Sequence, residues 1–359
     1  MVTLFNIRPK GFNVGNDAIY IAMQRFIYNA FRGIVNIITL PATARYESEA
    51  KAGLTAKTVY EINQYGHGVI VGGGNLYENG ELDVDLDALE ALEVPMMLFS
   101  LSRGRVYNRN LELVDRTDAM AERIVTALNR KASYSIARDK QTYGYLQSIG
   151  FKDVQIGGCP TIFLDYIKER LPEVSDRYKE SVLVSVRNPN LMSIPLAHQA
   201  KVYNDIVAIT SLLRDEGFND IRLLCHDQRD ISFAASFQDI EYIYTGDVYT
   251  YLSLLKSCAL NVAYRLHAFL PCLAFDTPSI KISYDERALS MIETIGYGSW
   301  DINMIQESDV VSAVKNRYGR ITELDNIKDH ARSKWGDLFN TMSEAFNSFA
   351  ADVKELARR

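Results

Sequence analysis

The chain has 359 residues, of which 47% are hydrophobic and 23% are charged, and its formal net charge is −6. This balance is typical of a folded globular protein, and the length predicts about two domains of ordinary size. An acidic chain has no overall positive field to attract nucleic acid, so we expect no nucleic-acid partner and expect locally placed arginines to hold any anionic ligand.

Short apolar or β-branched runs alternate with longer helix-like segments along the chain, which is typical of βαβ units and a parallel sheet. A first series of expected strands lies at residues 3–7, 35–39, 68–71, 96–101, 134–137 and 154–156. A second series lies at residues 181–187, 221–225, 242–244, 260–264 and 280–283. The predicted fold class is therefore α/β, with two Rossmann-like parallel-sheet domains that face each other across a cleft.

The charged, proline-containing segment 168–179 lies between the two series and is the best candidate for a linker between domains. We place the boundary near residue 177, which gives an N-terminal domain of residues 1–176 and a C-terminal domain of residues 177–325. In the tail, residues 326–359, apolar side chains recur at steps of three and four, which predicts an amphipathic helix that packs back on the domains.

The four cysteines are widely separated and form no C-x-x-C pair, so we expect reduced thiols and no disulfide framework. No pair of histidines stands at metal-ligand spacing, and neither G-x-G-x-x-G nor a Walker lysine occurs, which predicts no metal and no nucleotide cofactor. Residues 1–11 do not form a signal peptide, and no apolar run reaches the length of a membrane span. We expect a cytoplasmic protein without a transmembrane segment, and leave open its contact with the inner face of the membrane and its oligomeric state.

The most informative segment begins where the expected strand 260–264 ends. Arg265 and His267 follow this strand at the start of an expected helix, and a further strand leads to Tyr284. The free backbone N–H groups and the dipole of a helix N-terminus favour an anion. Arginine can hold a phosphate or carboxylate bidentately, and histidine can transfer a proton near neutral pH. The alternative is structural: Arg265 pairs with a local acid and His267 caps the turn.

Two turns of the first half are also expected to face the cleft. Gly72–Gly74 would let the backbone approach a ligand closely, or would serve only the turn itself. Asp17 precedes an expected helix at residues 18–29, and a role as helix N-cap is favoured over a role as general base, although one residue could do both.

Two acidic segments have structural and functional interpretations. Asp83, Asp85 and Asp87 resemble a metal-binding D-x-D motif, but carboxylates at this spacing fit the capping of a helix better. His226 and Asp227 follow the expected strand 221–225 and so point at the cleft, where a solvated loop is an equally good interpretation.

These segments, in their order along the chain, resemble the polysaccharide pyruvyl transferase family. The run Arg265-Leu-His-Ala, followed by a proline turn, a strand and Tyr284, is similar to the family's C-terminal hallmark. Four further segments resemble family motifs: Asn13-Val-Gly15-Asn16-Asp17, Gly72-Gly73-Gly74-Asn75-Leu76, Ala137-Arg138-Asp139 with Thr142 and Leu146, and Val184-Ser-Val-Arg187. The resemblance spans residues 3 to about 295 and rests on the order and spacing of the segments together.

Three positions depart from the family pattern. Thr142 stands where serine is usual, and Arg287 where a lysine is usual, so a hydroxyl and a cation are kept. The segment 101–105 replaces a glycine-rich turn that should face the cleft, which would fit a different acceptor or second substrate.

The resemblance implies a GT-B-like fold and a metal-independent transferase that uses no cofactor. It implies that a pyruvyl group passes from phosphoenolpyruvate to a sugar diol of a cell-surface or exopolysaccharide, or of its precursor, which could be lipid-linked. On this basis the donor would contact Arg187, Arg265, Leu266, His267 and Tyr284. The acceptor would contact Asn13, Gly15, Asn16, Gly73, Gly74 and Asn75. His267, Arg265 and Asp17 would carry the catalysis.

Two other functions fit the same segments, because architecture does not determine function. A GT-B glycosyltransferase could use Arg187 and Arg265 for the diphosphate of a nucleotide sugar and His267 for a sugar hydroxyl. Room and stacking groups for a nucleobase in the C-terminal pocket would favour this alternative. A carbohydrate-binding protein without activity would need the arginines but no titrating histidine.

Overall fold

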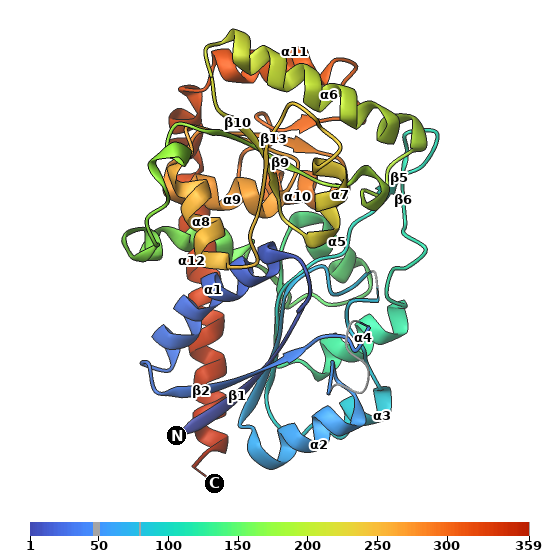
Figure 1. Cartoon of the computed structure of the whole chain (residues 1–359). Coiled ribbons are helices and arrows are strands. Elements are labelled where there is room, and N and C mark those ends of the chain that lie inside the picture. The colour runs from blue at the N-terminus through green and yellow to red at the C-terminus, as the bar shows by residue number, and fades with distance from the viewer. Residues whose placement is uncertain (46–50, 79, 359) are drawn as a thin grey trace.

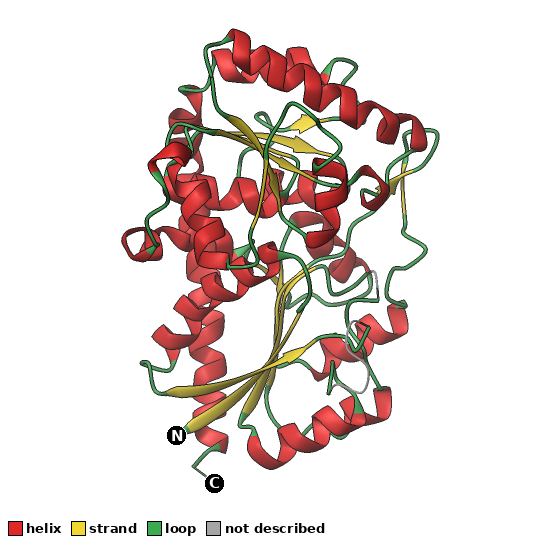
Figure 2. Cartoon of the chain, viewed as in Figure 1, coloured by secondary structure: helices red, strands yellow, loops and turns green. Residues whose placement is uncertain are grey.

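The computed structural model describes residues 1–45, 51–78 and 80–358. Figure 1 shows two α/β lobes, one above the other, with both chain ends at the lower lobe. In Figure 2, helices cover the faces of the sheets in both lobes. The expected α/β fold with two parallel sheets is confirmed.

The first sheet has six parallel strands in the order β2-β1-β3-β4-β7-β8. Its strands are β1 (Val2–Arg8), β2 (Val35–Pro41), β3 (Gly68–Gly74), β4 (Met96–Leu101), β7 (Tyr134–Ala137) and β8 (Gln155–Ile156). The helices of this lobe are α1 (Val14–Ala30), α2 (Ala56–Tyr65), α3 (Leu86–Glu90), α4 (Glu122–Lys131) and α5 (Lys140–Ser148). Strands β3 and β4 are buried along their whole length, as expected for central strands covered on both faces.

The second sheet also has six parallel strands, in the order β11-β10-β9-β12-β13-β14. Its strands are β9 (Val182–Val186), β10 (Ile221–Cys225), β11 (Tyr242–Tyr244), β12 (Leu260–Ala263), β13 (Ser279–Ser283) and β14 (Ile302–Asn303). The helices of this lobe are α6 (Leu196–Asp215), α7 (Ile231–Ala234), α8 (Val248–Ser257), α9 (Leu266–Phe275), α10 (Glu286–Thr294) and α11 (Val310–Gly319). Helix α9 is apolar nearly all round because it lies in the core between the lobes.

All eleven expected strands are present, with ends that differ by three residues or fewer. The sequence patterns missed β14 and the antiparallel hairpin of β5 (Val106–Tyr107) and β6 (Leu113–Val114), because each of these strands has only two residues. The first sheet uses strands from residues 2–156 and the second from residues 182–303. A domain boundary near residue 177 stays a prediction within the stretch that connects the sheets.

The C-terminal helix α12 (Glu323–Leu356) contacts both lobes, as its red ribbon in Figure 1 shows. Trp335 Nε1 donates a hydrogen bond to the carbonyl oxygen of Ile295 in the upper lobe, at 2.9 Å. Asp352 accepts one from the hydroxyl of Tyr134 in the lower lobe, at 2.8 Å. None of the helices in the described part of the chain combines the length and the apolar character that crossing a bilayer requires.

The order of the strands determines where a ligand can bind. Each sheet has a point at which successive crossovers run in opposite directions, between β1 and β3 in the first sheet and between β9 and β12 in the second. In open parallel sheets, ligands bind in the crevice beyond the carboxyl ends of the strands at this point. The loops after these four strands are therefore where a site is expected.

Candidate active site

A cavity of about 370 Å³ lies between the carboxyl ends of the two sheets. The loops after β1 and β3 contribute residues from one side, and the loops after β9, β10, β12 and β13 contribute residues from the other. This volume falls within the range of small-molecule sites. The structure thus places the cavity at the two points that the strand order indicates.

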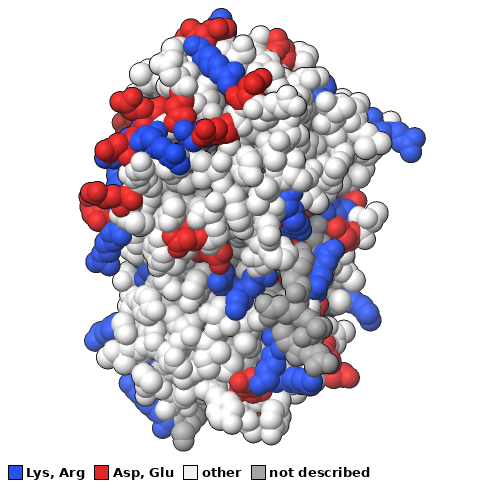
Figure 3. All heavy atoms as spheres, in the orientation of Figure 1, with Lys and Arg blue, Asp and Glu red and all other residues white. Residues whose placement is uncertain are grey.

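The cavity gathers positive charge in a chain that is acidic overall. Among the described residues, its lining contains eight arginine or lysine side chains and three carboxylates, whereas the whole chain carries a net charge of −6. Figure 3 shows basic side chains at the waist between the lobes, on the right of the view. A lining of this kind favours an anionic ligand.

Arg265 directly follows β12 and is the N-cap residue of α9. Its side chain is only 7% exposed, lines the cavity, and makes no hydrogen bond or ion pair among the described residues. The structural alternative for Arg265, a pair with a local acid, is therefore wrong. A buried cation without a partner is costly, so this guanidinium is poised to hold an anion.

Arg187 directly follows β9, the strand next to β12, and also lines the cavity. Its Nη1 lies 3.3 Å from carboxylate oxygens of Asp227 and Asp230. Burial, and then the neighbouring charge of Arg265, lower the pKa of Arg187. The two guanidinium groups thus repel each other, and an anion between them would relieve this repulsion.

His267 is the second residue of α9 and faces the same cavity. Its Nε2 lies 3.6 Å from Sγ of Cys159, and it does not cap the turn, because no side chain caps α9. Burial, and then the charges of Arg138, Arg265 and Arg287, lower the pKa of His267 well below 6.5. This lowered pKa favours the neutral imidazole at pH 7. A bound anion would offset the arginine charges and raise this pKa. Leu266 and Tyr284, the other expected donor contacts, also line the cavity.

His226, which follows β10, is a member of the site that the sequence did not assign. It is 1% exposed and lines the cavity, so the solvated-loop interpretation is wrong. The Tyr251 hydroxyl donates to the carbonyl oxygen of His267 at 3.0 Å and lies 2.9 Å from Nδ1 of His226. Since that hydroxyl has one hydrogen, the network assigns the N–H of His226 to Nδ1 and leaves Nε2 as an acceptor.

On the N-terminal side, α1 begins earlier than expected. Asn13, not Asp17, is the N-cap: its Oδ1 accepts from the backbone N–H of Gly15 at 3.0 Å, and the helix starts at Val14. The N-cap expectation for Asp17 is wrong because Asn13 already has the extended backbone and the acceptor that a cap needs. Asp17 instead lies in the first turn, 2.8 Å from Nη1 of Arg8, and is not among the residues that line the cavity.

The expected acceptor residues divide into two groups. Asn13, Asn16 and Asn75 line the cavity. Gly15, Gly73 and Gly74 are not among the residues that line it. Gly73 and Gly74 are the last residues of β3, directly before Asn75, and their φ angles of +82° and +105° favour glycine.

The segment 101–105 does not line the cavity but joins the lobes. Arg105 donates to the carboxylate of Glu286 on α10, and Gly104 packs against Arg287. Arg287 Nη1 donates to Glu78 at 2.8 Å, which links α10 to the first lobe a second time. The turn therefore lies between the lobes, but it is not part of the cavity wall, because Arg105 and Gly104 contact α10 instead.

The Asp83–Asp87 segment has the structural role that was favoured. Asp85 is the N-cap of α3, and its Oδ1 accepts from the backbone N–H groups of Asp87 and Ala88. Within the described ranges, no group of three or more potential ligands could hold a metal ion.

Comparison with known proteins decides the family. The family model for polysaccharide pyruvyl transferases matches residues 13–286, a range that includes Arg187, Arg265 and His267 of the cavity. The chain belongs to this family. None of the curated proteins compared with it matches.

Solved structures show the fold that this family member shares. UDP-N-acetylglucosamine 2-epimerase from Rickettsia bellii is 12% identical, with a TM-score of 0.57 over 99% of this chain and 96% of that chain. MnaA of S. aureus with UDP is 16% identical, with a TM-score of 0.56 over 90% of each chain. The Neisseria meningitidis 2-epimerase bound to UDP-GlcNAc is 10% identical, with a TM-score of 0.56 over 99% of each chain. These similarities show that the chain has the GT-B fold.

Two cavity residues were not among the predicted site residues, although His226 was expected to point at the cleft and Arg138 lies in a segment that resembles a family motif. Arg138 and His226 line the cavity and directly follow β7 and β10. Each stands at the carboxyl end of a strand, the same signal that identified Arg187 and Arg265. The signal could have found them, but it does not say which strand ends lie close enough to share a ligand.

A methyl group at Gly15 is expected to disturb the site. A Cβ there would lie 2.5 Å from Nε2 of His226 and 2.9 Å from Cβ of His267. Gly15→Ala should therefore lower turnover by about 10-fold or more, since small displacements of catalytic groups are costly. Steady-state kinetics would measure it, with Gly144→Ala as control, because nothing lies within 4 Å of a Cβ at that helical position. Equal turnover in the two variants would contradict the prediction.

Acid is expected to destabilise this pyruvyl transferase family member through His226. Burial, and then the charges of Arg265, His267 and Arg187, lower the pKa of His226 well below 6.5. Below about pH 6.5 the unfolded chain binds more protons than the folded chain, so the free energy of unfolding falls with pH by up to about 1.4 kcal/mol per pH unit. Above about pH 6.5 the contribution of neutral His226 to the free energy of unfolding is fully present.

Urea unfolding at about pH 7.5 and pH 5.5 measures this effect. The His226→Gln variant should lose less stability over the same interval, whereas His330→Gln, on an exposed position of α12, should behave like the wild type. Equal losses in wild type and His226→Gln would contradict the assignment.

Proposed function

We propose that this protein transfers the pyruvyl group of phosphoenolpyruvate to two hydroxyl groups of a sugar in a cell-surface polysaccharide or its precursor. The observation that carries the proposal is the unpaired, nine-tenths buried guanidinium of Arg265 beside Arg187 and His267, in a member of this family. This arrangement suits a small, highly charged donor with a proton-transfer step beside it.

The donor is a trianion with a carboxylate and a phosphate group. In the proposal, Arg187 and Arg265 bind these two groups, because a guanidinium offers a planar fork of N–H donors that matches both. The backbone N–H groups at the start of α9, from Leu266 to Ala268, supply further donors. Tyr284 lies on the same wall.

The reaction balances without a metal or cofactor. A proton adds to the methylene carbon of phosphoenolpyruvate, and a sugar hydroxyl attacks the adjacent carbon. The bond from that carbon to the phosphate oxygen then breaks, and a second hydroxyl closes the ketal. The two sugar hydroxyl groups lose one proton each. These two protons balance the one gained by the new methyl group and the one carried away by phosphate. His267 is the proposed proton carrier, since donor binding would raise its pKa toward neutrality.

The acceptor is proposed to lie on the N-terminal side of the cavity, against Asn13, Asn16 and Asn75. Amide side chains both donate and accept hydrogen bonds, which suits sugar hydroxyls. Asp17 is not part of the proposed chemistry, because it pairs with Arg8 away from the cavity lining.

A direct test measures phosphate release from phosphoenolpyruvate with a panel of galactosides, glucosides and mannosides. Acceptor-dependent release, together with a product that has gained a ketal, would support the proposal and identify the sugar. No release with any acceptor, with thermal protection by a nucleotide sugar instead, would favour the glycosyltransferase alternative.

A further inference from the structure

His226 presents an unused basic nitrogen at the cavity. The hydroxyl of Tyr251 gives its single hydrogen to the carbonyl oxygen of His267, so it can only accept from the N–H at Nδ1 of His226. Nε2 of His226 then carries a lone pair. It lies 3.4 Å from the same hydroxyl, which has no second hydrogen to donate, and no other donor among the described residues reaches it.

This lone pair lies on the side of the cavity where the acceptor is proposed. A Cβ built on Gly15 would stand 2.5 Å from Nε2 of His226 and 3.1 Å from Oδ1 of Asn13. Nε2 is therefore next to the start of α1, where Asn13 and Asn16 line the cavity. A histidine of the second lobe thus meets the acceptor side of the first.

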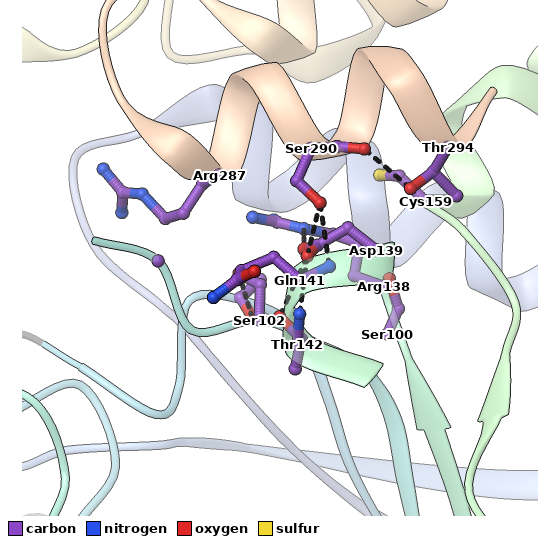
Figure 4. A network of polar contacts seen from close by, with 12 residues as sticks. Ser100, Ser102, Arg138, Asp139, Gln141, Thr142, Cys159, Arg287, Ser290 and Thr294 are labelled. Atoms are coloured by element: carbon purple, nitrogen blue, oxygen red, sulfur yellow. Dashed lines mark hydrogen bonds and ion pairs between the residues drawn. The ribbon is translucent and has the colours of Figure 1, made fainter. Parts of the chain in front are cut away.

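Contacts between the lobes fix this arrangement. The backbone N–H of Val14 donates to the carbonyl oxygen of His226 at 3.1 Å. The lobes are joined at a second place, where the backbone N–H of Gln141 donates to the hydroxyl of Ser290 on α10 at 3.0 Å. Figure 4 shows this second contact, with α10 lying over the turn that carries Gln141. His226 is therefore held beside α1 by contacts that need no ligand, which preorganises it.

The charges around His226 favour its neutral form. Burial, and then Arg265 after β12, His267 on α9 and Arg187 after β9, lower the pKa of His226 well below 6.5. A neutral imidazole is the form that can accept a proton. An anion bound by Arg187 and Arg265 would offset their charges and raise this pKa, so the imidazole becomes a stronger base when the donor is bound.

The carboxylates of the cavity lining are poorer candidates for a base. Asp118 pairs with Arg116 at 2.7 Å, and Asp285 forms an ion pair with Arg287. Both pairs hold the carboxylate in its charged, hydrogen-bonded form, which weakens it as a base. Glu81 also lines the cavity, and burial raises its pKa, which makes it the rival to be separated by experiment.

We propose that His226 is the general base of the transfer and that its Nε2 takes the proton of the sugar hydroxyl that attacks the donor. This inference rests on the proposed function and deepens it, because it divides the proton transfers between two histidines. The oxygen of the hydroxyl forms a bond to the central carbon of phosphoenolpyruvate while its O–H bond breaks and the proton moves to Nε2.

The remaining steps return both histidines to their starting state. When the bond from the central carbon to the phosphate oxygen breaks, its electron pair leaves with phosphate, and the imidazolium of His226 gives phosphate its proton. His267 gives one proton to the methylene carbon and takes one from the second hydroxyl as the ketal closes. No oxidant, reductant or further reactant is needed.

The test is His226→Asn, because asparagine can still donate to Tyr251 from a position near Nδ1 but has no nitrogen that accepts a proton. We expect kcat for acceptor-dependent phosphate release to fall by about 10²-fold or more, as for loss of a positioned general base. The dissociation constant for phosphoenolpyruvate, measured by direct binding, and Tm near neutral pH should stay those of the wild type. His330→Asn on the exposed side of α12 is the matched control and should keep wild-type turnover.

The pH dependence of kcat separates a base from a structural residue. Wild-type kcat should fall as the pH drops through the pKa of His226 in the loaded enzyme, because an imidazolium cannot accept a proton. This acid limb should be absent in His226→Asn and present in Glu81→Gln. The reverse pattern would assign the base to Glu81 and overturn the proposal.

Tyr251→Phe keeps the basic nitrogen and removes the hydroxyl that orients the ring. Its turnover should fall less than that of His226→Asn, and its acid limb should persist. A larger loss in Tyr251→Phe, or a joint loss of Tm and donor affinity in His226→Asn, would show that the hydrogen-bond network carries the effect and would overturn the proposal.

Failure of this inference is distinguishable from failure of the proposed function. If the wild type releases phosphate with an acceptor from the sugar panel and His226→Asn does so equally fast, His226 is not the base while the proposed function survives. If the wild type releases no phosphate with any acceptor, the proposed function fails and the role of His226 as its base fails with it.

Discussion

Replacing His267 with alanine is expected to lower turnover by about 10²-fold or more, because a positioned general acid or base contributes about this much. His267 lies at the start of α9, with cavity-lining arginines on both sides of it. Burial, and then the charges of those arginines, lower its pKa well below 6.5. Alanine leaves the backbone of α9 intact while removing the imidazole nitrogens that are proposed to carry the proton.

The measurement is the rate of phosphate release at saturating phosphoenolpyruvate and acceptor, with Tm as a check of the fold. His330→Ala is the matched control, because His330 lies on an exposed position of α12 and bonds only the carbonyl oxygen of Asn326 among the described residues. Wild-type turnover in His267→Ala would remove His267 from the mechanism. An unchanged affinity for phosphoenolpyruvate with lost turnover would separate chemistry from binding.

Replacing Arg265 with lysine is expected to raise KM for phosphoenolpyruvate by about 10-fold or more, a loss of about 1.4 kcal/mol in binding. Lysine keeps the positive charge but loses the planar fork, so a bidentate contact becomes a single one. The Arg265 side chain is 7% exposed and has no partner among the described residues, so its N–H donors are available for the donor molecule.

Initial rates over a range of donor concentrations measure this effect. The control is Arg317→Lys, since Arg317 donates to the carbonyl oxygens of Ser299 and Trp300 and does not line the cavity. Its KM for the donor should match that of the wild type. If Arg265→Lys also keeps the wild-type KM, then Arg265 does not bind the donor.

Much of the fold was predictable because strand and helix patterns are local. Runs such as Val182–Val186 are apolar at every position except Ser185, and this near-continuous apolar pattern is typical of a strand that is buried on both faces. Hairpins and strands of two residues, such as Ile302–Asn303, carry too little pattern to be recognised. The start of α1 was misplaced because Asn13 and Asp17 are both good capping residues, and only the backbone geometry distinguishes them.

Part of the site was predictable for a similar reason. A polar residue directly after a buried parallel strand lies at the ligand-binding edge of its sheet, whatever the rest of the fold does. Arg187 and Arg265 follow β9 and β12 in this way, and both line the cavity. Asp17 was misjudged because its nearest cation, Arg8, comes from the end of β1 and meets it only after α1 folds back over the sheet.

By itself, the sequence determined the two series of parallel strands, the C-terminal helix and the arginines at the ends of β9 and β12. These follow from periodicity and from the residue next to a strand end, which are local properties. Only the tertiary structure decided that Arg265 has no acidic partner among the described residues, that His226 lies close to His267, and that Arg138 enters the cavity from the other lobe. Charges and hydrogen bonds act over a few ångströms, so their partners depend on how the two lobes pack and not on distance along the chain.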